Sequence, residues 1–472
     1  MAKVAIIGGG VAGGSAALYL SNLNLDVTLF EQNSSLVSGP PFCHLHSGGN
    51  LYREIPDDEC ITLLHQSIDL LRFYPYAIDY RPTVVITPVE DEEDPKNIIP
   101  RLNKLQKEYE LSVKKDNQNE VLGKVEEYFK IYNKEEILKL KEKDIVKRPN
   151  TLDEWMIPAA KNIDLEKIKF PVLIVQEYGL NLFRLSAGLN ISLEENQNCN
   201  CMLDTKVINV TKEDEKYLVE YKQKDKIDTK SFDYLINSAG YKTGEIDDML
   251  GFKRERFVEF KAAYVTKWKG CDTIWPEVIF HGKRGTPQGM GQFTPYPEGY
   301  FQLHGMTNEI TLFDKGLVKS SSLSAQPKLN ENFIKKIEYK WSENIINERT
   351  KKAINHLAKY IPAFSSAQVA AKPLYGAQQI PGLDKELRAA DVTFEGDSYA
   401  RCEVVKASSV LTMIDEIIKK MVKLGFVSKK DLYKRDFNFK ELSDDIILKE
   451  AQKISTQREY PASLAKINTT KS

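Results

Sequence analysis

The chain has 472 residues, with 66 lysine and arginine residues against 67 aspartate and glutamate residues, for a net charge of −1. This balance argues against a dedicated nucleic-acid-binding protein, which normally has a basic excess. The six cysteines include no C-x-x-C pair, so we expect neither a metal site nor a disulfide framework. No apolar run suits a transmembrane helix, and glycines interrupt the apolar N-terminus where a signal peptide would need a helix. These features favour a cytoplasmic protein.

A glycine-rich turn follows the first predicted strand. The apolar run over residues 4–7 predicts a buried strand, and small residues over 15–20 predict a helix. Between them stand Gly8, Gly10 and Gly13, at the spacing G-x-G-x-x-G. The first glycine permits a tight turn, the second lets the backbone approach a pyrophosphate, and the third lets the helix pack closely on the strand. The helix N-terminus then presents free N–H groups to the phosphates. The pattern predicts a dinucleotide-binding turn.

The second predicted strand, over residues 27–30, ends in Glu31. At this offset from the glycine turn, a carboxylate can accept hydrogen bonds from both ribose hydroxyls of a dinucleotide. A carboxylate also disfavours a 2′-phosphate, so the pattern argues against NADP. The glycine turn and Glu31 alone leave the choice between FAD and NAD open.

The loop over residues 38–52 is rich in small residues and contains His44 and His46. Three interpretations of these histidines stay open. They contact a flavin or move protons, one of them carries a covalently bound flavin, or both serve only as hydrogen-bonding groups of the loop.

Two further regions have sequence patterns that predict helices and strands outside the dinucleotide-binding segment. Residues 101–150 are rich in lysine and glutamate at helical spacing and predict two or three surface helices. Residues 255–313 alternate β-forming residues with turns, which predicts an antiparallel sheet. The polar C-terminal residues favour loose packing.

Three later segments complete a recognisable arrangement. They are a strand and helix region over 171–209, an apolar strand over 232–240, and the segment 394–402 with an apolar-striped helix over 403–419. Their candidate cofactor contacts are Val207, Gly240, Gly396 and Asp397. Together with the glycine turn, these segments resemble the D-amino-acid-oxidase-like superfamily of FAD-dependent oxidoreductases.

The resemblance implies FAD as the cofactor and an α/β fold with a Rossmann-type FAD-binding domain assembled from discontinuous segments. That domain would comprise residues 1–75, 160–250 and 370–430. An antiparallel-sheet substrate domain with a helical insertion would comprise 76–159 and 251–369, followed by a C-terminal extension over 431–472. The loop over 38–52 would run beneath the isoalloxazine ring, and the C-terminal helix would point its N-terminus at the flavin.

Oxidation of a C–H bond beside a hydroxyl or amine requires a base for the substrate proton and a cation for a substrate carboxylate. His281 and His304 lie on the predicted substrate sheet and are the candidate bases. Arg284 and Arg388 are the candidate cations, with Lys372 as a further one. Each of these residues also has a purely structural interpretation, because single histidines in sheets and charged side chains at surfaces are common.

Within the superfamily, the chain most resembles the malate:quinone oxidoreductase-like branch. The resemblance rests on the length, the lysine- and glutamate-rich insertion, Gln176-Glu177-Tyr178-Gly179 with the leucine-rich helix after it, and Lys372-Pro373. It implies oxidation of malate or a related 2-hydroxy acid, with electrons passed to a membrane quinone. Two alternatives on the same fold stay open, namely an amino-acid oxidase or dehydrogenase and a flavin-binding protein without turnover. An NAD enzyme without flavin is a third.

A quinone acceptor implies contact with a membrane. The amphipathic pattern over residues 413–426, with clustered lysines, is suited to an anionic bilayer at the inner face of the cytoplasmic membrane. Packing of this helix on its own domain is the favoured interpretation, because most amphipathic helices in globular proteins bury their apolar face.

Overall fold

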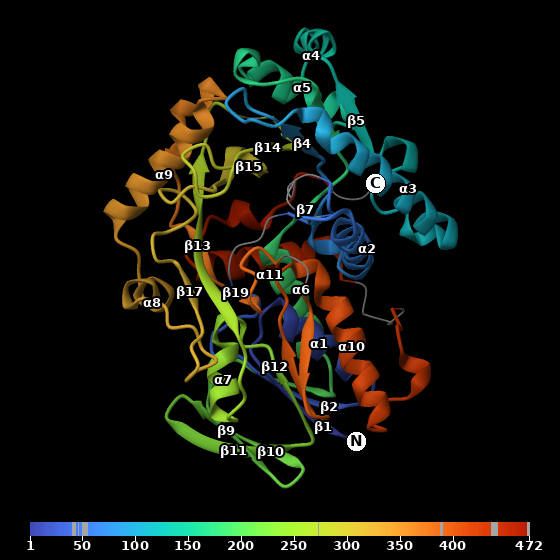
Figure 1. Cartoon of the computed structure of the whole chain (residues 1–472), viewed down its shortest axis with the longest axis vertical. Helices are drawn as coiled ribbons and strands as arrows, with labels where there is room; N and C mark the ends of the chain where they lie inside the picture. The colour runs from blue at the N-terminus through green and yellow to red at the C-terminus, as the bar shows by residue number, and fades with distance from the viewer. Residues whose placement is uncertain are drawn as a thin grey trace.

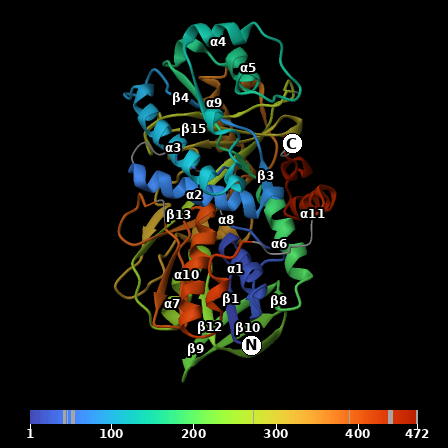
Figure 2. The ribbon, with the colours of Figure 1, turned by 90° about the vertical axis from the view of Figure 1, so that its right-hand side faces the viewer.

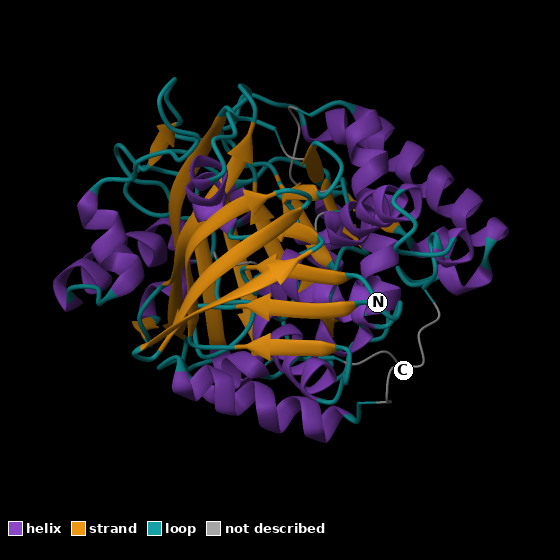
Figure 3. Ribbon diagram, turned by 90° about the horizontal axis from the view of Figure 1, so that it is seen from below, coloured by secondary structure: helices purple, strands orange, loops and turns teal. Residues whose placement is uncertain are grey.

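The computed structural model describes residues 1–39, 44–45, 47–49, 55–271, 273–387, 390–435 and 442–469. Two sheets organise the chain, one of six strands and one of ten. They occupy different ends of an elongated molecule, with the six-stranded sheet in the lower half of Figure 1. Seen from below in Figure 3, the strands gather in the centre and helices surround them.

The six-stranded sheet has the order β20-β21-β12-β1-β2-β8. Its strands are β1 (Lys3–Ile7), β2 (Asp26–Phe30), β8 (Cys199–Met202), β12 (Tyr234–Asn237), β20 (Val392–Glu395) and β21 (Tyr399–Cys402). All neighbours are parallel except the β20–β21 hairpin. The central strands are apolar along their length because both faces are covered. This sheet is the predicted Rossmann-type unit, and it is built from discontinuous segments as expected.

Three helices cover this sheet near the glycine turn: α1 (Val11–Ser21), α6 (Leu182–Glu194) and α10 (Val410–Lys423). α1 contacts both α6 and α10, and α10 also contacts α2 (Asp57–Phe73). The apolar side of α10, including Leu411, Ile414 and Ile418, is buried in these contacts. That side therefore does not face a membrane. Among the described residues, no helix has the length and apolar character that a membrane span requires.

The ten-stranded sheet forms the substrate half. Its strands are β4 (Thr83–Ile86), β5 (Phe129–Tyr132), β6 (Val172–Val175), β13 (Arg256–Lys267), β14 (Glu277–Phe280), β15 (Gly291–Tyr296), β16 (Tyr300–Gly305), β17 (Leu317–Lys319), β18 (Gln368–Val369) and β19 (Leu374–Pro381). Neighbouring strands are antiparallel except β4 and β14, so the predicted antiparallel sheet over 255–313 is confirmed.

Two predicted domain boundaries need correction. Residues 172–175 and 374–381, assigned from the sequence to the FAD-binding domain, instead pair with β4 and β13.

Two small sheets complete the strands. β9 (Thr205–Glu213), β10 (Lys216–Gln223) and β11 (Lys226–Phe232) form a three-stranded sheet that projects at the lower end of Figure 1. β3 (Ile78–Asp79) pairs with β7 (Gly179–Leu180) as a two-stranded antiparallel sheet.

The predicted helical insertion is present as α3 (Ile99–Lys115), α4 (Lys134–Lys141) and α5 (Leu152–Asn162). Asn133 and Thr151 cap α4 and α5, each in a reciprocal hydrogen-bonding arrangement with a glutamate three residues later. On the other side of the molecule lie α7 (Thr243–Met249), α8 (Glu331–Glu338) and α9 (Glu343–Ala358), opposite α3 in Figure 1.

The described part of the C-terminal extension over residues 442–469 is packed, so the expectation of loose packing is wrong there. α11 (Asp444–Gln457) lies against α6, as Figure 2 shows at the right-hand edge. Ile447, Ala451 and Ile454 are buried on one side of this helix. Their helical spacing forms a narrow apolar stripe that the polar composition of the segment conceals.

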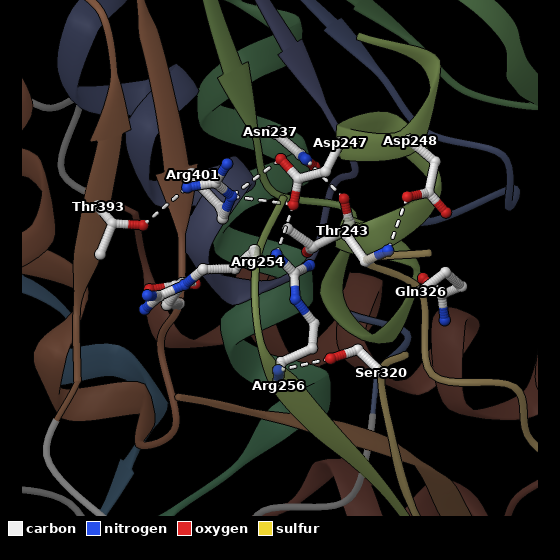
Figure 4. Close-up of polar contacts among 12 residues, drawn as sticks. Asn237, Thr243, Asp247, Asp248, Arg254, Arg256, Ser320, Gln326, Thr393 and Arg401 are labelled. Carbon is white, nitrogen blue, oxygen red and sulfur yellow. Dashed lines mark hydrogen bonds and ion pairs between the residues drawn. The ribbon is translucent and has the colours of Figure 1, made fainter. Parts of the chain in front are cut away.

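A buried carboxylate joins the two large sheets. Asp247, on α7, is fully buried and accepts hydrogen bonds from Arg401 of β21 at 2.8 and 2.9 Å. It also pairs with Arg256 of β13, and the Tyr399 hydroxyl donates to it at 2.7 Å. Asn237, at the end of β12, donates to the same Tyr399 hydroxyl at 2.7 Å. Figure 4 shows the two arginines converging on Asp247 from different strands.

We expect the substitution Asp247→Asn to lower the free energy of unfolding by about 3–5 kcal/mol, because it removes the buried carboxylate that pairs with both Arg256 and Arg401 and leaves Arg401, among the described residues, only the longer ion pair with Glu395 at 3.8 Å. Urea denaturation followed by circular dichroism measures the change. The matched control is Asp248→Asn on the same helix, where the exposed carboxylate accepts from the Ala325 N–H at 2.7 Å. An equal loss in both variants would contradict the special role of Asp247.

Candidate active site

Two cavities meet above the glycine turn. The first has a volume of about 690 Å³ and lies between the six-stranded sheet and the ten-stranded sheet. The second, of about 620 Å³, extends from the turn toward Glu31 and Val207. Both are lined by Gly10, Gly39, Ser238, Gly240, Tyr241 and Ala377, so they adjoin over these residues. Their volumes lie in the range of small-molecule and cofactor sites. The pair suits one extended ligand with a ring system at each end.

The glycine turn is packed so closely that two of its positions exclude any side chain. Gly8 has φ of +98°, and a Cβ there would lie 2.4 Å from the carbonyl oxygen of Ser238. A Cβ on Gly13 would lie 1.9 Å from the carbonyl oxygen of Gly8. Gly10 differs, because a Cβ there would meet no atom within 4 Å and the residue lines both cavities. The open space at Gly10 is where the fold places a pyrophosphate.

Glu31 is 5% exposed and lines the second cavity. Its carboxylate accepts hydrogen bonds from the Gly9 N–H at 2.6 Å and from the backbone and side-chain N–H groups of Asn33 at 2.7 Å. Burial raises the pKa of this carboxyl group. A carboxylate offers about four acceptor positions, so three protein donors leave room for a ribose hydroxyl. Val207 lines the same cavity from β9.

The structure contradicts two predicted cofactor contacts. Gly396 and Asp397 lie in the turn between β20 and β21, where the Asp397 side chain is 82% exposed and pairs with Lys420. Because β21 runs parallel to β12, this turn lies at the sheet edge opposite to the Asn237 end. The end of β21 and the segment after it approach the site instead, and they line the first cavity with Cys402, Val404, Val405, Lys406, Ala407 and Ser408. The helix after it begins at residue 410, later than predicted.

The first cavity brings together most of the predicted catalytic residues. His281 follows β14, His304 lies on β16, and Arg284 lies in the loop between β14 and β15. His44, from the loop after Glu31, lines the same cavity. Arg388 and His46 fall outside the described residues. Lys372 lies on the second cavity, where it pairs with Glu459 at 2.9 Å.

His304 is held as a neutral imidazole. Burial lowers its pKa to about 4. The Tyr296 hydroxyl donates to Gln302 Oε1 at 3.1 Å, which leaves the Gln302 amide nitrogen to donate to His304 Nε2 at 3.0 Å. With Nε2 accepting, the proton of the neutral ring resides on Nδ1. His304 is therefore arranged as a hydrogen-bond donor through Nδ1.

Arg284 does not act as a lone cation. Its guanidinium pairs with Glu259, which also pairs with Lys261 at 2.7 Å. The two cations outnumber the one carboxylate, so this cluster keeps a single positive charge beside the cavity. Burial would raise the pKa of Glu259, but the charges of Lys261 and Arg284 lower it.

His44 belongs to a buried ionic cluster that the sequence analysis missed. Its Nδ1 lies 3.1 Å from Glu277 and its Nε2 lies 3.4 Å from Glu177. Arg81 also pairs with Glu277, at 2.6 Å, and the Gly49 N–H donates to Glu177 at 2.6 Å. Burial alone would lower the pKa of His44, but the two carboxylates raise it. Burial would raise the pKa of Glu277, yet His44 and Arg81 lower it to about 2. His44 is thus an imidazolium that ties its loop to β14.

These features together define a dinucleotide-dependent oxidoreductase, with a nucleotide cleft at one end and a histidine-lined substrate cavity at the other. The family model described as FAD dependent oxidoreductase matches residues 3–372. The chain therefore belongs to this DAO family of FAD-dependent oxidoreductases, and its cofactor is FAD. No curated protein sequence gives a significant match.

Several solved structures share the fold at low sequence identity. L-α-glycerophosphate oxidase from Mycoplasma pneumoniae, with FAD bound, is 16% identical with a TM-score of 0.57, covering 89% of this chain and 95% of that one. Glycine oxidase from Geobacillus kaustophilus is 11% identical with a TM-score of 0.58, covering 93% and 97%. L-proline dehydrogenase from P. horikoshii is 13% identical with a TM-score of 0.58, covering 98% and 99%.

The residues fit FAD. Gly10 leaves space for the pyrophosphate, α1 presents its N-terminus there, and Glu31 retains acceptor capacity for the ribose. The first cavity, next to the turn, would hold the isoalloxazine ring. His44 and Leu45 line it on the side of the 38–52 loop, and the segment before α10 lines it as well.

We expect Gly10→Ala to leave the apoprotein folded but to weaken FAD binding about tenfold or more, because the added methyl group enters the pyrophosphate space and not the protein. Flavin fluorescence titration of the apoprotein measures the affinity, and thermal denaturation measures the fold. Gly270→Ala, outside both cavities, is the control and should change neither. Wild-type FAD affinity in the Gly10 variant would refute this placement of the pyrophosphate.

The His44 cluster predicts a pH-dependent stability. Because folding raises the pKa of His44 above its unfolded value of about 6.5, its ionic contribution is fully present below that pH. The contribution disappears as the pH rises through the folded pKa. The difference in unfolding free energy between wild type and His44→Gln should therefore be largest near pH 5.5 and shrink toward pH 9. His65→Gln, on the exposed side of α2, is the control. A difference that grows with pH would show that His44 is not protonated in the folded state.

Proposed function

We propose that this FAD-dependent oxidoreductase oxidises a small 2-hydroxy acid, with malate as the favoured substrate, and passes the electrons to a quinone. One observation carries the choice of substrate. The first cavity combines buried histidines with a positive balance of charge.

The charges around the cavity favour an anionic substrate. The cations among its lining residues are Lys261, Lys283, Arg284, Lys385 and Lys406, together with the His44 imidazolium, whose charge Glu177 and Glu277 balance. The one acid among the described lining residues is Glu386. Glu259, which does not line the cavity, pairs with Lys261 and Arg284 and neutralises one of these two positive charges. The remaining positive balance suits a dicarboxylate, since each substrate carboxylate gains a charge-assisted hydrogen bond.

His304 and His281 have different roles in the proposed reaction. His304 is neutral with its proton on Nδ1, so it donates a hydrogen bond to the substrate oxygen or carboxylate. His281, 5% exposed at the same cavity, takes the hydroxyl proton as the substrate becomes a ketone. The cluster of Lys261 and Arg284 holds a carboxylate and fixes which C–H bond faces the flavin. When bound, FAD accepts the hydride from that carbon.

Amine oxidation is the second candidate. The fold likeness to glycine oxidase and L-proline dehydrogenase supports it. The charge balance supports it less, because an ammonium substrate would meet several cations in the cavity. A flavoprotein without turnover is the remaining alternative, and the presence of His281 and His304 in one cavity argues against it.

The electron acceptor is proposed on the resemblance to the malate:quinone branch. Quinone reduction would bring the protein to the inner face of the cytoplasmic membrane as a peripheral protein. The contact surface would not be the apolar side of α10, which is buried against α1 and α2. Reoxidation of the reduced enzyme by a water-soluble quinone, compared with oxygen, distinguishes the two acceptors.

We expect malate to bleach the flavin absorbance under anaerobic conditions, ahead of glycine, proline and glycerol 3-phosphate. His281→Asn should slow this reduction about 10²–10⁴-fold, as the loss of a general base does. His65→Asn, at an exposed position of α2, is the matched control and should reduce at the wild-type rate. Bleaching by amines alone would select the amine oxidase, and no bleaching by any acid or amine would select the non-catalytic alternative.

A further inference from the structure

The C-terminal segment reaches the nucleotide cleft. Residues Arg458 and Tyr460, directly after α11, line the second cavity together with Glu31 and Val207. This region lies beyond the part of the chain that the family model matches. It is fixed in place by α11 on α6, by Asn181 Nδ2 donating to the Leu464 carbonyl at 2.8 Å, and by buried Leu464 itself.

Arg458 holds the loop after Glu31, which contacts the glycine turn. Its Nη1 donates to the Val37 carbonyl at 3.0 Å, and its Nε and Nη2 donate to Ser35 Oγ at 3.1 and 2.8 Å. The Val37 N–H in turn donates to the Gly9 carbonyl at 2.9 Å. The Arg458 guanidinium therefore contacts Val37, and Val37 in turn contacts the backbone of the glycine turn, where the pyrophosphate would bind.

The charge of Arg458 is not balanced by the groups it touches. Its acceptors in the described part of the chain are hydroxyl and carbonyl oxygens of Ser35, Leu36, Val37 and Ser186. Nη1 has two N–H groups and a single acceptor among these residues. Burial lowers the pKa of Arg458 to about 10, and the charges of Tyr460 and Glu31 only partly oppose this shift. Arg458 is partly buried, and withdrawing a cation from water is costly unless an anion pairs with it.

The other cations on this cavity are engaged elsewhere or lie at its rim. Lys372 pairs with Glu459 at 2.9 Å and Lys242 pairs with Glu338 at 3.7 Å. Lys206 is exposed. Arg458 is thus the cation best placed to meet an anion inside the cleft.

We propose that Arg458 is a cofactor-binding residue, whose guanidinium supplies the positive charge for the pyrophosphate of FAD from the C-terminal segment. The site takes a nucleoside diphosphate moiety, so ADP alone is a sufficient probe. The role is separate from the choice of substrate, because Arg458 does not line the first cavity.

The test is the affinity of the apoprotein for FAD and for ADP. Arg458→Gln should raise both dissociation constants about tenfold or more, the usual worth of a charge-assisted hydrogen bond. Arg458→Lys keeps the charge and should recover most of the affinity, although lysine cannot reproduce the guanidinium contacts to the loop. Wild-type affinity should also fall more steeply with salt than that of Arg458→Gln.

The matched control is Arg349→Gln on α9. Arg349 likewise donates to backbone carbonyls, those of Ile310 and Leu312, at 2.6 and 2.7 Å, but lies outside both cavities. This variant should lose thermal stability and bind FAD and ADP normally. The proposal is overturned if Arg458→Gln binds ADP as wild type does, or if Arg458→Lys and Arg458→Gln are equally impaired, since either result means a structural role alone.

Discussion

One buried carboxylate sets the spacing between the two halves of this protein. Asp247 forms ion pairs with Arg401 of the six-stranded sheet and with Arg256 of the ten-stranded sheet. All three side chains are almost fully buried. Because an unpaired buried charge is so costly, the two sheets are stable at the separation that lets both arginines reach Asp247. The cavities open at this junction. Cys402, next to Arg401, lines the first cavity, and Ser238, next to the linked Asn237, lines both.

The nucleotide half of the site was predictable because its information is local. Gly8, Gly13 and Glu31 lie close together in the sequence, and their spacing follows from the geometry of one strand, one turn and one helix. The antiparallel substrate sheet was also predictable, because strand alternation is a short-range pattern. His281 and His304 could be placed on that sheet, and the structure brings both to the same cavity.

The features that the sequence could not predict depend on contacts between residues that lie far apart along the chain. Gly396 suggested a cofactor loop, but strand direction decides which end of a strand meets the cleft, and direction follows from the whole sheet order. Glu177 and Glu277 resemble ordinary acids in the sequence, and only the fold brings them to His44, Glu277 from β14 and Glu177 from the segment between β6 and β7. The polar composition of the last segment concealed the apolar stripe that places Arg458 at the second cavity.

The order of these segments along the chain has a consequence for biosynthesis. Residue 4 pairs with residue 234, and residue 235 pairs with residue 399, so the central sheet closes through contacts between remote parts of the polypeptide. A chain emerging from the ribosome exposes the apolar strand β1 long before its partner β12 has been made. The flavin cleft is completed later still, when the segment around residue 458 has left the exit tunnel. Cofactor capture therefore belongs to the end of synthesis, and until then one edge of β1 lacks its native partner.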